Sequence, residues 1–198
     1  MASRLDSLRR LLRDEEVRSI SRRYLVSNGF DGALTCVGVV VGAFLTGVPN
    51  GLVVVQIGLG AAVGLATSGV WSVWEIERAE KLADLQSVED AMLTELDDTQ
   101  LARDLSGARV VNATASGLGP LVGILVPLVP FLVTGDPFTV GLLSVREATV
   151  ASVGFAVAVL FAFGAYMGSI SKQRWYVAGF RMGLAGLVVA GINLLLPG

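Results

Sequence analysis

The sequence contains no histidine and a single cysteine, Cys36. A disulfide within the chain is therefore excluded, as are zinc sites built from Cys and His side chains. The lack of histidine also removes the Ser-His and Cys-His pairs that activate nucleophiles in hydrolytic enzymes. We do not expect an enzyme, and any metal site must use carboxylates, amides, hydroxyls, thioethers or backbone carbonyls.

Charged residues are scarce. Only 16% of the 198 residues are charged, 53% are hydrophobic, and the mean hydropathy is +0.68. From Gly32 to Trp74 there is no charged residue, a run of 43 positions. Because a helix needs about 20 apolar residues to cross the hydrocarbon core, this run is long enough for two passes. The composition therefore predicts an integral membrane protein rather than a soluble domain.

Five apolar segments predict an all-α fold with five transmembrane helices. The expected spans run from about Leu25 to Thr46, Leu52 to Trp74, Val110 to Val133, Ala148 to Ile170 and Trp175 to Leu196. The helical pattern continues past Trp74 without a breaker, which predicts one long helix that leaves the membrane. Three prolines in the third expected span predict a kinked or broken helix whose freed carbonyls need other donors.

The basic residues indicate an orientation. Seven arginines lie within residues 1–23, and they predict a basic amphipathic helix on an anionic cytoplasmic membrane surface. On the opposite side of the membrane we expect only Arg146, so the N-terminus should be cytoplasmic and the C-terminus outside. The expected parts are the N-terminal helix 1–23, spans one and two in 24–74, an acidic cytoplasmic insert in 75–108, and spans three to five in 109–198. Small size and the lack of a recognisable targeting signal favour a prokaryotic plasma membrane.

One carboxylate, Asp31, lies just inside the first expected span. A charge at this depth is costly, so a functional role is the first hypothesis. Two copies facing each other across a two-fold axis could bind a divalent cation or share a proton. The alternative is a structural ion pair with Arg181, which we expect at a similar depth in the fifth span. Asn28 and Thr35 are candidate polar groups of the same transport path.

The expected insert is acidic: ten of the 17 carboxylates lie between Glu75 and Asp104. Glu77, Glu80 and Asp84 have i, i+3, i+7 spacing and should share one helical face. Met92, three residues from both Glu89 and Glu95, adds a soft sulfur that suits ferrous iron. The candidate metal ligands are Asp31, Glu77, Glu80, Asp84, Glu89, Met92, Glu95 and Asp98, and Glu75 is a candidate for the mouth of the path. The alternative is an ordinary solvated helical face.

Glycine pairs with i, i+4 spacing recur in every expected span and could bring helices close together. The pairs are Gly38/Gly42, Gly60/Gly64, Gly119/Gly123, Gly164/Gly168 and Gly179/Gly183. We expect most of them to pack within the chain and the others to meet a second copy.

The segment Asn28-Gly29-Phe30-Asp31-Gly32-Ala33-Leu34-Thr35, followed by Gly38, resembles the first-span signature of the vacuolar iron transporter family. Three other stretches agree with it, namely Gly64-Leu65-Ala66 leading to Glu75, Pro127-Leu128-Val129-Pro130-Phe131, and Trp175 with Gly179-Phe180-Arg181-Met182. The chain thus looks like a small prokaryotic member. The resemblance implies a homodimer whose first spans line a path on the two-fold axis. It also implies export of ferrous iron, and sometimes manganese, from the cytosol in exchange for protons, with an acidic insert that gathers metal.

The chain departs from the family pattern at two places. The position that carries a path-lining methionine in many members corresponds here to Trp71, and the insert of about 30 residues is shorter than in eukaryotic members. Two alternatives therefore remain. The chain could be a transporter of the same fold with another cargo, or a membrane scaffold whose acidic helix binds a partner. For the leading hypothesis the expected partners are a divalent metal ion (Fe²⁺ or Mn²⁺, as substrate), membrane lipid and a second copy. No nucleic acid and no permanent cofactor are expected.

Overall fold

The computed structural model describes residues 14–92, 100–134 and 143–195. Its elements are α2 (Glu15–Leu45), α3 (Gly51–Met92), α4 (Gln100–Leu128), the short 3₁₀ helix η1 (Val129–Val133), α5 (Val145–Ile170) and α6 (Trp175–Leu195). Within this part of the chain, five helices are long and apolar enough to cross a membrane. The predicted all-α membrane fold with five spans is therefore confirmed.

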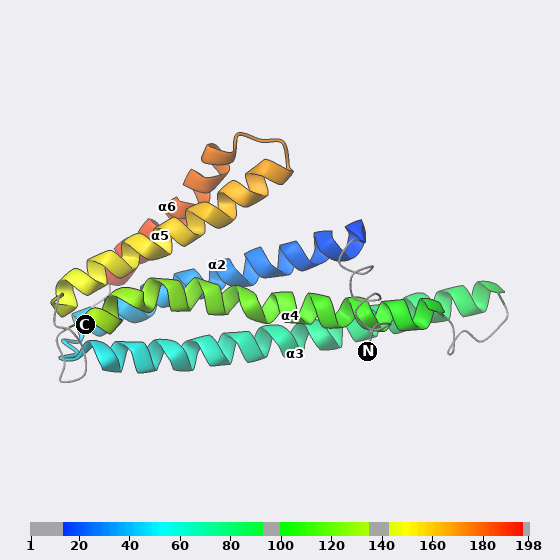
Figure 1. The fold of residues 1–198 in the computed structure, drawn as a ribbon, viewed down its shortest axis with the longest axis horizontal. Helices are drawn as coiled ribbons and strands as arrows, with labels where there is room; N and C mark the ends of the chain where they lie inside the picture. Colours follow the sequence, from blue (N-terminus) through cyan, green and yellow to red (C-terminus); the bar gives the residue numbers. More distant parts are fainter. Residues whose placement is uncertain (1–13, 93–99, 135–142, 196–198) are drawn as a thin grey trace.

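The helices form a three-helix layer and a hairpin. The first three, α2, α3 and α4, lie side by side, with α4 packed against both of the others, while α5 and α6 form a hairpin that packs on α2 and α4 (Figure 1). The start of α2 lies at the end of the molecule where α3 and α5 finish, and α6 finishes at the opposite end (Figure 1). This is the arrangement that an odd number of spans requires.

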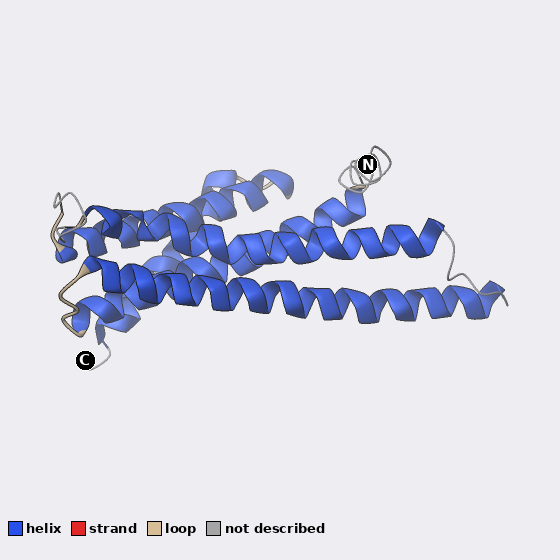
Figure 2. Cartoon of the chain, turned by 60° about the horizontal axis from the view of Figure 1, so that its bottom comes forward, coloured by secondary structure: helices blue, strands red, loops and turns tan. Residues whose placement is uncertain are grey.

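The long second helix is present as expected, because α3 runs without interruption from Gly51 to Met92. Its last turns, with the first turns of α4, extend beyond the other helices (Figures 1 and 2). The start of α2 differs from the expectation. Asp14 caps this helix by accepting a hydrogen bond from the Glu16 amide at 3.0 Å. Residues 15–23 are thus the first turns of α2 and no separate surface helix, since no breaker precedes the apolar run; residues 1–13 lie outside the described part.

Prolines change the third span less than expected. The α-helix continues through Pro120 as far as Leu128, and only then does the chain tighten into η1. Proline lacks the amide that would donate to the carbonyl four residues earlier, which here is that of Ser116. Asn28 of α2 donates its side-chain amide to this carbonyl at 3.4 Å. A neighbouring helix therefore satisfies the group that Pro120 frees, as we expected for a proline inside the membrane.

Three of the five glycine pairs pack within the chain. A Cβ on Gly123 would lie 2.3 Å from the Gly29 carbonyl oxygen, and one on Gly164 would lie 2.5 Å from that of Ala178, so the backbones touch. The packed pairs are Gly119/Gly123 between α4 and α2, and Gly164/Gly168 with Gly179/Gly183 between α5 and α6. Around Gly38/Gly42 and Gly60/Gly64 the structure places nothing within 4 Å of such a Cβ. Those two pairs lie on faces that the protomer leaves open.

Candidate functional site

Asp31 is exposed on the surface of α2. Thr35, Gly38 and Gly42 follow it at i+4, i+7 and i+11, so the four residues form one line along the helix, here called the α2 open stripe. Within the described part of the chain, no hydrogen bond or ion pair involves the Asp31 carboxylate. A charged group on an otherwise apolar span thus has no partner among the described residues, which leaves it available to a cation, a proton or a second copy.

The alternative role for Asp31, an ion pair with Arg181, is not formed. Arg181 is exposed on α6. Among the described residues, the side-chain ion pair is that of Arg78 with Glu75, at 3.9 Å along α3. Neither charge holds the other in place, so removal of one would not strand the other.

Asn28 has a structural contact instead of facing the open stripe. Its amide nitrogen donates to the Ser116 hydroxyl as well as to the Ser116 carbonyl. The Ser116 hydroxyl in turn donates to the Gly69 carbonyl at 2.8 Å. This chain of bonds ties α2, α4 and α3 together one turn before Asp31. Sequence reasoning missed Ser116, although its place four residues before Pro120 was a usable signal. Thr35 is half-buried on the stripe.

The acidic residues of α3 differ in burial. Glu75 is exposed and forms an ion pair with Arg78 along the same helix, and its role at the mouth of a path stays a prediction. The face expected for Glu77, Glu80 and Asp84 exists because α3 is continuous, but Glu77 is only 2% exposed while Glu80 and Asp84 are exposed. The solvated-face reading is therefore wrong for Glu77, because α4 covers that turn of α3.

Glu77 belongs to a polar cluster between α3 and α4. Three residues before it, Trp74 carries the Arg109 guanidinium 4.0 Å from its ring centroid. Asn112, one turn after Arg109, accepts a hydrogen bond from the Ser21 hydroxyl at 2.6 Å. Glu77 Oε2, Arg109 Nε and Asn112 Nδ2 are buried and have no hydrogen-bond partner in the described structure. One acceptor and two donors on α3 and α4 are thus buried without a hydrogen-bond partner, which is costly unless water or a cation enters.

Tyr24 of α2 lies within electrostatic range of both Glu77 and Glu80. Asp31 follows Tyr24 by seven residues, which is about 10 Å of helix rise. The cluster and the open stripe therefore lie at neighbouring depths of the same end of the molecule. Along α2, a cation attracted by the carboxylates of α3 would have a short distance to travel to Asp31.

The other candidate ligands stay predictions. Glu89 and Met92 belong to α3, but the structure does not describe their side chains, and Glu95 and Asp98 lie outside the described residues. In the described ranges, no three Asp, Glu or Cys side chains come close enough to hold a metal ion. Of the candidate ligands whose side chains the structure describes, Asp31 lies on α2 and Glu77, Glu80 and Asp84 lie on α3, and they form no closed coordination shell.

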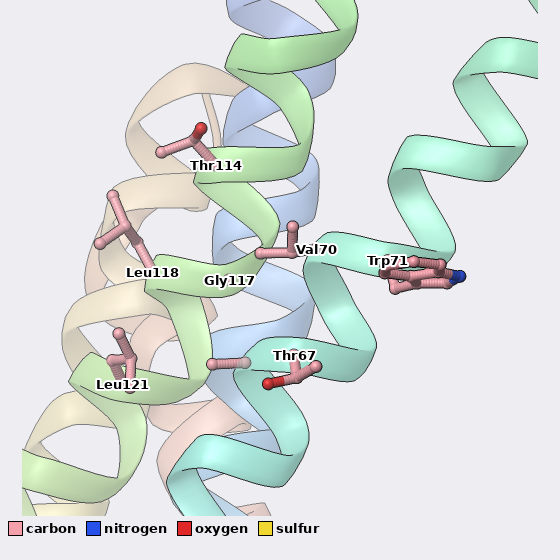
Figure 3. Close-up of a pocket in the computed structure, with 8 residues that line it drawn as sticks. Thr67, Val70, Trp71, Thr114, Gly117, Leu118 and Leu121 are labelled. Atoms are coloured by element: carbon pink, nitrogen blue, oxygen red, sulfur yellow. The ribbon is translucent and has the colours of Figure 1, made fainter.

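A groove of about 400 Å³ opens between α3 and α4, and no carboxylate is among the described residues that line it. Figure 3 shows Val70 directed toward Gly117 of α4, whereas Trp71 points away from α4. Trp71 is 70% exposed. The groove walls are apolar apart from Thr67 and Thr114, so this groove does not provide an ion path.

Comparison with known proteins supports the family resemblance. Residues 72–196, more than half of the chain, match the VIT family. The chain is similar to the "Uncharacterized protein MJ0645" of Methanocaldococcus jannaschii, with 26% identity over 173 residues that cover 85% of this chain and 84% of that protein. No solved structure matches the chain. The VIT family is a family of transporters. The chain therefore belongs to the VIT family and is an integral membrane transporter of metal ions.

Proposed function

We propose that the protein moves Fe²⁺ or Mn²⁺ out of the cytosol in exchange for protons and that it works as a homodimer. The observation that carries this proposal is the exposed, unpaired carboxylate of Asp31 on an apolar span. By the positive-inside rule, the basic residues near the start of α2 favour the cytoplasmic side for that end, where the acidic part of α3 would collect cations.

Two copies of Asp31 supply the coupling. If the α2 open stripes of two protomers face each other, the two carboxylates approach one another in a medium of low dielectric constant. Two bare carboxylates repel there, so the pair holds either a proton or a divalent cation. Binding of the metal on one side then releases the proton, and protonation on the other side releases the metal. This exchange needs no further titrating group.

The dimer contact is predicted to use the α2 open stripe. Small residues let membrane helices approach closely, and leucines at Gly38 and Gly42 would hold two copies of α2 apart. Since nothing in the protomer lies within 4 Å of a Cβ at either position, the double variant should fold. We expect it to elute as a monomer in light scattering of the detergent-solubilised protein. Leucines at Gly154 and Gly191, which are equally open, form the matched control and should leave the dimer intact. A dimeric Gly38→Leu/Gly42→Leu protein would contradict this contact.

The acidic part of α3 is predicted to bind divalent metal weakly. Changing Glu77, Glu80 and Asp84 to the corresponding amides removes three carboxylates from one face of the helix without changing its length. Calorimetric titration of Mn²⁺ should then show fewer or weaker sites, because hard cations prefer carboxylate oxygens. The control variant, Glu15→Gln with Glu16→Gln, removes exposed charges from the start of α2 and should titrate like the wild type. An unchanged stoichiometry in the first variant would mean that these three carboxylates do not bind the metal.

Liposomes that contain the protein and a trapped pH-sensitive dye test the proposed function. An imposed Mn²⁺ gradient, or an Fe²⁺ gradient under reducing conditions, should drive protons in the opposite direction. Metal uptake without a change in internal pH would refute the coupling to protons. If neither ion moves, the protein carries a different cargo, and the assignment of Fe²⁺ or Mn²⁺ as the substrate is wrong.

A further inference from the structure

A second groove lies between the first turns of α2 and the early part of α4. Its volume is about 140 Å³, and it is separate from the groove between α3 and α4. The described residues that line it are Val17, Arg18, Ser21, Arg22 and Leu25 of α2 with Val111 and Ala115 of α4. Its walls are almost entirely apolar, because Arg18 and Arg22 line it with their aliphatic stems rather than with their guanidinium groups.

Polarity changes along this groove. The helices α2 and α4 run in the same direction here, because Ser21 bonds to Asn112 and the Leu25 carbonyl lies against Gly119. Arg18 and Arg22 therefore lie toward the end where the helices start, and Leu25 lies toward the membrane interior. From Arg18 to Leu25 the helix rises about 10 Å. The groove is thus apolar, and the two residues that carry a positive charge line its outer end.

Neither guanidinium group forms an ion pair with a described carboxylate, Asp14 and Glu15 at the start of α2 included. In the described part of the chain, no side-chain hydrogen bond or ion pair involves Arg18 or Arg22. Their i, i+4 spacing puts them side by side on α2. Two adjacent cations without counter-ions favour an anionic occupant, and guanidinium groups bind phosphate oxygens in a bidentate manner.

We propose that this groove binds an anionic phospholipid of the cytoplasmic leaflet. The phosphate group lies between Arg18 and Arg22, and an acyl chain follows Leu25, Val111 and Ala115 toward the membrane interior. Basic recesses between membrane helices on the cytoplasmic side are known to accept anionic headgroups. A phospholipid matches the observed order of charge followed by apolar surface along the membrane normal.

Two other occupants fit the groove less well. Residues 1–13 contain Leu5, Leu8 and Leu12, but they also carry four arginines, so the two guanidinium groups would repel that segment. A second copy of the chain would bring the same two arginines to the contact, which is unfavourable for the same reason. Charge complementarity therefore selects the lipid.

The full-length protein in detergent tests this site when it is titrated with phosphatidylglycerol and examined by native mass spectrometry. Because each arginine near an anionic lipid surface contributes about 1 kcal/mol, Arg18→Gln with Arg22→Gln should weaken phosphatidylglycerol binding roughly 30-fold. The matched control, Lys172→Gln with Arg174→Gln, removes two charges from the exposed turn between α5 and α6 and should bind like the wild type. Equal binding by the two double variants would overturn the proposal.

Two further measurements separate the lipid from simpler ligands. Ala115→Phe keeps both arginines and fills the inner end of the groove, so it should also weaken phosphatidylglycerol binding. Unchanged binding in that variant would refute the placement of the acyl chain. Phosphatidylcholine and inorganic phosphate should bind weakly, since one lacks the net charge and the other lacks the chain. If either one binds as tightly as phosphatidylglycerol, the site is not one for an anionic phospholipid.

Discussion

The Asp31→Asn protein is expected to show no metal-driven proton movement in liposomes while it stays folded and dimeric. Asparagine has nearly the shape of aspartate, but it lacks the charge that holds the cation and the group that carries the proton. The rate should fall to that of liposomes without protein. The same dye assay that tests the proposed function measures the effect, with an Mn²⁺ gradient as the driving force.

Stability should change little in this variant. The Asp31 carboxylate forms no hydrogen bond or ion pair among the described residues, so the amide removes no stabilising contact of that kind and leaves no opposite charge unpaired. If an ion pair with Arg181 were broken instead, the loss would be about 3–5 kcal/mol. Thermal melting of the purified protein distinguishes the two cases.

Two control variants complete the test. Glu16→Gln changes an exposed carboxylate of the same helix outside the open stripe. Arg181→Met removes the cation of the alternative ion pair with Asp31. Both should transport and melt like the wild type. Transport that survives in the Asp31→Asn protein would disprove the coupling role, whatever its stability.

The membrane spans could be predicted because charge is so unevenly distributed. The uncharged run from Gly32 to Trp74 fixes two helices and the turn between them, and the observed helices α2 and α3 contain the first two expected spans almost entirely. The start of α2 was predicted less well. Arginine is a good helix former, and nothing between Asp14 and Tyr24 breaks a helix, so the boundary expected at residue 23 had no local cause.

The burial of Glu77 could not be predicted from the sequence. The i, i+3, i+7 pattern places Glu77, Glu80 and Asp84 on one face, but whether that face meets water depends on how far α4 runs beside α3. The alignment of α4 beside α3 is a tertiary property, and it depends on close contacts such as that of Gly69 with Ser116. The role of Asn28 was hidden for the same reason, because its partner lies 88 positions away in the chain.

The position of Asp31 depends on a close crossing of α2 and α4. A Cβ on Gly123 would lie 2.3 Å from the Gly29 carbonyl oxygen and 2.7 Å from the Ala33 amide nitrogen. Both neighbours are backbone atoms, so no side-chain rotation can relieve the contact. A side chain at position 123 must therefore push α2 and α4 apart. The two contacts lie at Gly29 and Ala33, on either side of Asp31 in α2.

Among the single substitutions proposed for this protein, Gly123→Leu is therefore expected to destabilise the folded state most. Forced separation of the helices opens the interface and strains the bonds from Asn28 to Ser116, and the expected loss is about 3 kcal/mol, the upper end of the usual cost of overpacking. The expected result is a protein that melts well below the wild type in detergent or aggregates on extraction. Gly154→Leu is the matched control, because no atom lies within 4 Å of a Cβ there, and it should melt like the wild type. Equal melting temperatures for the two variants would show that α2 and α4 do not cross as closely as this structure places them.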